Sequence, residues 1–255
     1  MARFILAVAL VFVSSFTVSQ TSVSDPQART LALKSVAALT NGVTVSDVTL
    51  TADVTSIAGS DVQSGTATLI ASTTNNSSRV DLNLSNTNIS EVRNVGGEGP
   101  AGAWVKNGSK SQSTAQHNNW TDAAWFFPSL SCLSQTTNPA FTFRYIGQEQ
   151  YGGVTVQHIR VFQTQTPTIQ QLSMMDFYLD AGSSLPLGLK FMIHADQDMN
   201  INIPVEVRFA NYQPISGILV PLQIQSLVNN SLALDISVTN AAFNIGEQPG
   251  TFTLP

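Results

Sequence analysis

The chain has 255 residues and a formal net charge of −5, and only 11% of its residues are charged, against about 25% in an average soluble domain. This charge argues against nucleic-acid binding, because no basic stripe is present to neutralise phosphates. A single cysteine excludes an internal disulfide, and a hydrophobic content of 43% argues against disorder. Serine, threonine, asparagine and glutamine make up about a third of the chain, so its polar surface must be mostly uncharged.

The N-terminus has the layout of a secretory signal peptide. Arg3 gives a short positive region, residues 4–16 form an apolar run, and small and polar residues follow, with cleavage expected after Ser19. The alternative is a transmembrane anchor, which needs about 20 apolar residues. We therefore expect residues 1–19 to direct export to the periplasm or the medium. Residues 20–255 are expected to form one domain, because no linker-like segment divides them. No later apolar stretch reaches spanning length, so this domain is not expected to span the membrane.

One amphipathic helix is predicted at the start of the mature chain. Asp25 can cap a helix that begins with Pro26, which loses no hydrogen bond at that position. Apolar residues then recur at helical spacing up to Leu39. The pair Asn41-Gly42 is typical of a helix end, because glycine readily adopts the left-handed conformation.

Most of the remaining chain alternates apolar and polar residues, which indicates antiparallel strands with one apolar and one wet face. The clearest alternating segments are residues 48–55, 80–85, 141–145, 187–193, 201–209 and 232–239. About ten or eleven strands are expected between Val43 and Phe243. Pro204 lacks a backbone N–H, so its strand should lie at an edge or carry a bulge there.

Two short helical segments are expected to interrupt the strands. Residues 123–133 follow the potential cap Thr121-Asp122, and Pro128 should kink or split this helix. Thr166-Pro167 begins a second short turn through Leu172. The fold class is thus α+β and mostly β: a strongly curved antiparallel sheet, or incomplete barrel, with a few helices over its concave face.

No catalytic residue, metal ligand or cofactor site is recognised. The three histidines, His117, His158 and His194, lack partners at metal-ligand spacing, and we interpret them as hydrogen-bonded structural residues. Cys132 has apolar neighbours and is expected to be buried and unreactive. The sequence Asp196-Gln197-Asp198 fits a hairpin turn better than a calcium loop. An enzyme is therefore not expected, although a hydrolase whose acidic pair is assembled only by the fold stays open.

The predicted sheet has more apolar surface than one full helix can cover. The remainder could be a cavity for an apolar ligand, with residues 120–133 as its lid. The alternative is that the helices and the sheet pack into a solid core. The candidate ligand-binding residues come from the lid and from the strands: Trp125, Phe126, Phe127, Leu130, Phe143, Phe191, Phe209 and Ile236.

The C-terminal third resembles the periplasmic lipoprotein carriers of the LolA/LolB-like superfamily. The residues that carry the resemblance are Asp176–Asp180, Leu185-Pro186, Phe209–Tyr212, Ser216–Pro221, Leu234–Asn240 and Phe243, in that order. The resemblance implies an incomplete barrel plugged by helices, and the binding or transfer of acylated or other apolar molecules in the cell envelope. It does not place the carriers' functional basic residue on any arginine of this chain.

Two functions are therefore carried forward. The first is an exported protein that binds an acyl chain, lipid or lipoprotein in a half-barrel cavity. The second is a non-catalytic structural or interaction protein of the envelope, which binds another protein through its neutral surface or an exposed strand edge.

Overall fold

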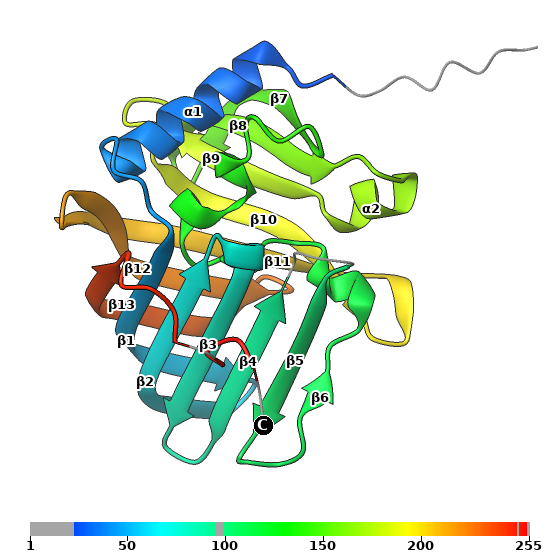
Figure 1. Ribbon diagram of the computed structural model, residues 1–255, viewed down its shortest axis with the longest axis vertical. Coiled ribbons are helices and arrows are strands. Elements are labelled where there is room, and N and C mark those ends of the chain that lie inside the picture. Colours follow the sequence, from blue (N-terminus) through cyan, green and yellow to red (C-terminus); the bar gives the residue numbers. More distant parts are fainter. Residues whose placement is uncertain (1–22, 95–98, 249, 254–255) are drawn as a thin grey trace, which may run out of the picture.

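The computed structural model describes residues 23–94, 99–248 and 250–253. One antiparallel sheet of thirteen strands runs through them, in the order β6-β5-β4-β3-β2-β1-β13-β12-β11-β10-β9-β8-β7 (Figure 1). The strands are β1 (Asp47–Ala58), β2 (Asp61–Ser72), β3 (Ser77–Leu84), β4 (Asn88–Asn94), β5 (Ala101–Lys106), β6 (Gln112–Ser113), β7 (Phe141–Tyr151), β8 (Val154–Gln163), β9 (Met175–Asp180), β10 (Pro186–Ala195), β11 (Asp198–Ile215), β12 (Ile218–Val228) and β13 (Ser231–Phe243). The predicted mostly-β class is confirmed, with two more strands than the upper expectation.

The strand order shows how the chain builds the sheet. It begins in the middle with β1, runs outward to the edge strand β6, crosses to the opposite edge strand β7, and returns strand by strand until β13 pairs with β1. Within the described residues β6 and β7 do not pair, so the curved sheet stays open (Figure 1). The segment between them, residues 114–140, must therefore cross from one edge of the sheet to the other.

Register shifts interrupt five of the twelve strand pairings. Such irregularities bend a strand and increase its local twist, which is how a sheet of this width can curve. The alternation predicted from the sequence decides which side faces inward. In β1, for example, Val48, Leu50, Ala52 and Val54 are buried, and they belong to one hydrophobic core on the concave face.

The first helix forms as predicted. In α1 (Pro26–Thr40) the Asp25 carboxylate accepts a hydrogen bond from the backbone N–H of Gln27, 2.8 Å away. Asn41 has a positive φ of 49° and ends the helix. Ala28 and Ala32 are fully buried, and they join α1 to the core on the concave face.

The helical segment predicted over residues 123–133 is split at Pro128, as expected, but its helical parts are 3-10 helices and not one kinked helix. The chain forms a turn followed by two short 3-10 helices, η3 (Pro128–Leu130) and η4 (Cys132–Ser134). Pro128 cannot continue an α-helix from the preceding turn, and Ser131 is extended and caps η4 with its hydroxyl. The helix predicted after Thr166 is confirmed as α2 (Pro167–Leu172), which packs against β8. Two further 3-10 helices are η1 (Thr74–Asn76) and η2 (Gln116–Asn119).

Pro204 lies in a strand that is central along only part of its length. Residues 205–215 of β11 pair with β12 on one side and, near their start, with β10 on the other. Pro204 itself pairs with Met192 of β10, and its carbonyl oxygen accepts a hydrogen bond from the N–H of Asn229, just beyond the end of β12. The expected edge position is therefore wrong, because β11 lies between β10 and β12; the missing N–H is tolerated at the point where the pairing with β12 stops.

No helix among the described residues is long and apolar enough to cross a membrane. The proposed signal peptide, residues 1–19, lies outside the described residues.

Candidate functional site

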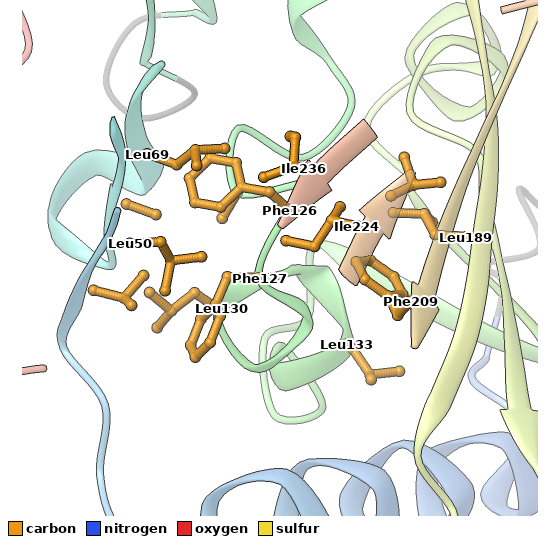
Figure 2. Close-up of a cluster of buried hydrophobic side chains, with 14 of the residues drawn as sticks. Leu50, Leu69, Phe126, Phe127, Leu130, Leu133, Leu189, Phe209, Ile224 and Ile236 are labelled. Atoms are coloured by element: carbon orange, nitrogen blue, oxygen red, sulfur yellow. The ribbon is translucent and has the colours of Figure 1, made fainter. Parts of the chain in front are cut away.

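The concave face of the sheet brings the predicted binding residues together. Phe126, Phe127 and Leu130 of the lid (residues 120–133) meet side chains from strands far apart in the sequence, such as Phe209 and Ile236 (Figure 2). Phe143 and Phe191 belong to the same core, and Trp125 packs against it, half-buried, with its ring edge-on to Phe126 at 5.5 Å. All eight predicted residues thus share one apolar interior.

This interior is filled in the conformation described. Phe126 and Ile236 are completely buried, and the two cavities found between the lid and the strands measure about 20 Å³ each. A volume of that size holds about one water molecule, far less than an acyl chain needs. Of the two alternatives that the sequence allowed, a cavity or a solid core, the solid core therefore describes this conformation.

Arg93 of β4 ties the start of the lid to the sheet. Its guanidinium is buried and donates to the carbonyl oxygens of Asn118, Thr121 and Asp122 at 3.0 to 3.1 Å. It also donates to the Thr121 hydroxyl at 3.2 Å. Burial lowers the pKa of Arg93, and the nearby carboxylates of Glu91 and Asp122 raise it. The charge is thus held mainly by the backbone of the crossover segment.

Glu91 and Arg93 are charged residues on the concave side of the sheet, where the alternation otherwise places apolar residues. The register pairs Glu91 with Val80, and it pairs the neighbouring Ile89 with Leu82, both of which belong to the concave core. Glu91 is therefore a carboxylate on the concave side, and burial raises its pKa while Arg93 opposes that shift. The signal was present in the sequence, because period two places Ile89, Glu91 and Arg93 on one face.

A second buried contact closes the lid upon itself. The Asp122 carboxylate accepts a hydrogen bond from the backbone N–H of Cys132, at 2.9 and 3.0 Å from its two oxygens. Burial raises the pKa of Asp122 to about 6, while the hydrogen bonds from Cys132 and the charge of Arg93 oppose the shift. A carboxyl group with this pKa changes its charge between mildly acid and neutral pH.

Cys132 is buried and free, as expected. Its sulfur lies 3.8 Å from the sulfur of Met175, and burial raises the pKa of its thiol well above the ordinary value. Since the thiolate is the reactive form, this shift keeps the group unreactive.

The three histidines occupy different environments, all outside the apolar interior. His158 lies between the carboxylates of Glu149 and Asp176, at 2.5 and 2.9 Å, and His117 Nε2 is 3.1 Å from the Ala195 carbonyl oxygen. The interpretation as hydrogen-bonded residues is therefore right for these two. It is only partly right for His194: neither buried ring nitrogen makes a hydrogen bond of good geometry to the described residues, but a hydrogen bond to the backbone of Met199 raises its pKa against the effect of burial. No group of three or more potential metal ligands is present in the described part of the chain.

Sequence comparison finds no relatives: no protein-family model matches, and no curated protein matches. The fold does have counterparts among solved structures. A Vibrio parahaemolyticus domain described as an outer membrane lipoprotein-sorting protein domain superposes with a TM-score of 0.58 at 11% identity, over 89% of this chain and 96% of its own. A DUF1329 family protein from Desulfovibrio piger gives a TM-score of 0.58 at 12% identity, over 89% and 95% of the two chains.

A LolA superfamily protein from Nitrosomonas europaea is similar to the same extent, with a TM-score of 0.56 at 9% identity, over 89% of this chain and 97% of its own. At such low identity these likenesses concern the architecture alone. The resemblance seen in the C-terminal third is confirmed at that level: the chain has the fold of LolA superfamily proteins.

Proposed function

We propose that this protein is an exported, non-catalytic carrier that binds an acyl chain, of a lipid or of an acylated protein, between its lid and the concave face of its sheet. Residues 1–19 direct export, and residues 20–255 form the carrier domain. The observation that carries the proposal is how loosely the segment that covers the concave face is attached to the sheet. One apolar interior is closed by a crossover made of turns and 3-10 helices, which few backbone hydrogen bonds join to the sheet.

Ligand entry then requires the lid to move, because the interior is filled. The side chains of Phe126, Phe127 and Leu130 cover strand residues that an acyl chain can cover equally well, so the exchange conserves buried apolar area. Arg93 and Asp122 hold the lid by polar contacts, which do not depend on what fills the interior. The shared fold with a domain described as lipoprotein-sorting supports a ligand of this class.

A fluorescent fatty acid titrated into the mature protein tests the proposal. We expect saturable binding, and we expect Arg93→Met to bind faster because its lid is less firmly held. Arg144→Met is the matched control, since Arg144 is an exposed arginine of the edge strand β7. A photoreactive fatty acid should label lid or concave-face residues such as Phe126 and Phe209. Absence of saturable binding to protein that is folded by circular dichroism would contradict the proposal.

The filled interior favours a second candidate, a non-catalytic structural or interaction protein of the envelope. Its core would then serve stability alone. In that case the fatty acid does not bind, and affinity capture from the native envelope retains the same protein partner in repeated experiments. An unchanged partner in the Arg93→Met variant would show that the lid takes no part in that contact.

A further inference from the structure

A cavity of about 410 Å³ lies outside the apolar interior, on the outer face of β10 and β11, which is the face opposite the core. Its size falls within the range of small-molecule sites. Six residues that alternate with core residues along the two strands line it, and we call it the outer pocket: Lys190, Met192, His194, Asn202, Pro204 and Glu206. Arg160 and Asp176, from β8 and β9, complete one end.

The strand register orders these residues by chemistry. Lys190 pairs with Glu206, Met192 pairs with Pro204, and His194 pairs with Asn202. The outer pocket is therefore charged at one end, apolar in the middle, and lined at the other end by an imidazole and an amide. His194 lies four positions after Lys190 on an extended strand, which corresponds to roughly 13 Å.

The carboxylates at the charged end are already hydrogen-bonded, apart from Oε2 of Glu206, which faces Lys190 at 3.8 Å. Arg160 donates to both oxygens of Asp176, at 2.7 and 2.9 Å. The Glu206 Oε1 atom accepts from the Tyr151 hydroxyl at 2.7 Å and from Arg208 at 2.8 Å. Although burial raises the pKa of each carboxyl group, these hydrogen bonds hold the pKa of Asp176 and that of Glu206 below the ordinary values.

The cations of the same end keep donors to spare. Lys190 Nζ lies 3.8 Å from Glu206 Oε2 and 5.0 Å from the ring centre of Tyr178, and it makes no hydrogen bond to any residue in the described ranges. Arg160 uses Nε and Nη2 for Asp176 and leaves Nη1 without a partner there. The charged end therefore offers positive donors, not free carboxylates.

The far end contains a polar group whose hydrogen bonding is incomplete. His194 is only 3% exposed, and neither ring nitrogen makes a hydrogen bond of good geometry to the described residues. Burial and the neighbouring ring of His117 lower the pKa of His194, while a hydrogen bond to the backbone of Met199 opposes the shift. A neutral imidazole offers one N–H donor and one acceptor nitrogen, so the contact with Met199 leaves at least one of them unpaired. A hydroxyl or amide group of a ligand would complete the hydrogen bonding of the ring.

We propose that the outer pocket binds a small amphipathic carboxylate that carries a hydroxyl or amide group at its far end. The carboxylate pairs with Lys190 and with Nη1 of Arg160. The apolar body lies along Met192 and Pro204, and the distal polar group bonds to the ring of His194. This site is separate from the interior of the proposed carrier, although Asn118, at the start of the crossover, bonds to the backbone of His194.

Calorimetric titration with ω-hydroxydecanoate tests the proposal, because this molecule spans roughly the distance between the two ends. We expect saturable binding to the wild-type protein. Decanoate lacks the distal hydroxyl and decane-1,10-diol lacks the carboxylate, so each should bind about tenfold more weakly, the equivalent of one hydrogen bond lost.

Two variants locate the binding. Lys190→Gln should weaken ω-hydroxydecanoate about tenfold, while Lys106→Gln, which removes an exposed lysine from β5, should leave it unchanged. His194→Phe should bind ω-hydroxydecanoate and decanoate equally, since the group that distinguishes them is gone. If His194→Phe does not fold, Lys190→Gln still decides the question, because its side chain is 42% exposed.

Three outcomes would overturn the proposal: no saturable binding to the wild type, equal affinities for ω-hydroxydecanoate and decanoate, or an unchanged affinity in Lys190→Gln. A Leu130→Ala variant separates this site from the interior, because Leu130 belongs to the lid and does not line the outer pocket. It should alter the binding of the fluorescent fatty acid and leave the affinity for ω-hydroxydecanoate as in the wild type.

Discussion

The concave interior and the outer pocket are built by neighbouring residues of the same strands, and they differ in what fills them. Phe191 and Val205 belong to the core and also border the outer pocket, whereas Lys190 and Glu206, next to them in the chain, face outward. The interior is apolar and filled by the lid. The outer pocket is open, of mixed polarity, and contains cationic donors that make no hydrogen bond to the described residues.

The difference shows how topology assigns roles to the two faces of one sheet. The crossover from β6 to β7 must pass over the concave face, so that face receives a cover of chain. Over β10 and β11 the outer face is covered only in part, by Gln171 and Met174 near α2 and by the ring of His117 against His194, and a hollow stays open there. Ligand binding in the interior therefore depends on how firmly the lid is held. Ligand binding in the outer pocket depends on how precisely its side chains are placed.

The largest expected effect tests whether the interior is a well-packed core. Phe126→Ala removes a completely buried ring and should lower the free energy of unfolding by about 3 to 5 kcal/mol. Leu33→Ala on the exposed side of α1, where Leu33 is 55% exposed, should change it by less than about 0.5 kcal/mol. Urea unfolding measures both. A loss below about 1 kcal/mol for Phe126→Ala would indicate a loosely packed lid and sharpen the case for ligand entry.

The next effect concerns the pH dependence of the lid. The pKa of Asp122 is raised to about 6 in the folded protein, so its contribution to stability is fully present below about pH 4 and is lost as the pH rises through 6. The loss amounts to at most about 3 kcal/mol. Asp122→Asn should remove this dependence, because it stays neutral at every pH.

Urea unfolding of the wild type and of Asp122→Asn at pH 4.5 and pH 7.5 measures the difference. Comparing the two proteins at each pH cancels the opposite trend of carboxyl groups with lowered pKa, such as Asp176 and Glu206. If the variant and the wild type lose stability in parallel between these pH values, Asp122 does not control the lid.

The smallest effect belongs to the outer face. Tyr151 lies across the strands and reaches Glu206 over Gly188, where a Cβ atom would clash with the hydroxyl oxygen and the ring of Tyr151. Gly188→Ala should therefore displace the ring and cost about 1 to 3 kcal/mol. Gly182→Ala, where a Cβ meets only ordinary contacts, is the control. Equal stabilities of the two variants would show that the Tyr151 position is not fixed by this packing.

Much of the local structure could be predicted because its causes are local. The cap of α1 by Asp25, the start of α2 at Thr166-Pro167 and the hairpin at residues 196–197 follow from side chains within a few positions. The strand faces followed from period two. The helix type of the lid could not be predicted from the sequence. Pro128 and Ser131 interrupt the helix, and whether the remaining turns are α-helical or 3-10 depends on contacts with the distant strands.

The candidate site divides in the same way. Alternation and aromatic content identified the eight residues of the interior, since burial of apolar side chains is largely decided by their own chemistry. The role of Arg93 in holding the lid was missed, because its partners are backbone atoms more than twenty residues away. Only its position on the concave face could be predicted, from the alternation that begins at Ile89. His194 was misjudged for a related reason: its incomplete hydrogen bonding is visible only once every neighbour is placed.

By itself the sequence determined the α+β class, the antiparallel strands, the apolar face and the unreactive environment of Cys132. These follow from periodicity and from the chemistry of adjacent residues. Only the tertiary structure decided that the concave interior is filled by the lid, that Arg93 and Asp122 hold it, and that a pocket opens on the outer face. These depend on the pairing of β1 with β13 and on the crossover from β6 to β7, which join residues that no local pattern connects.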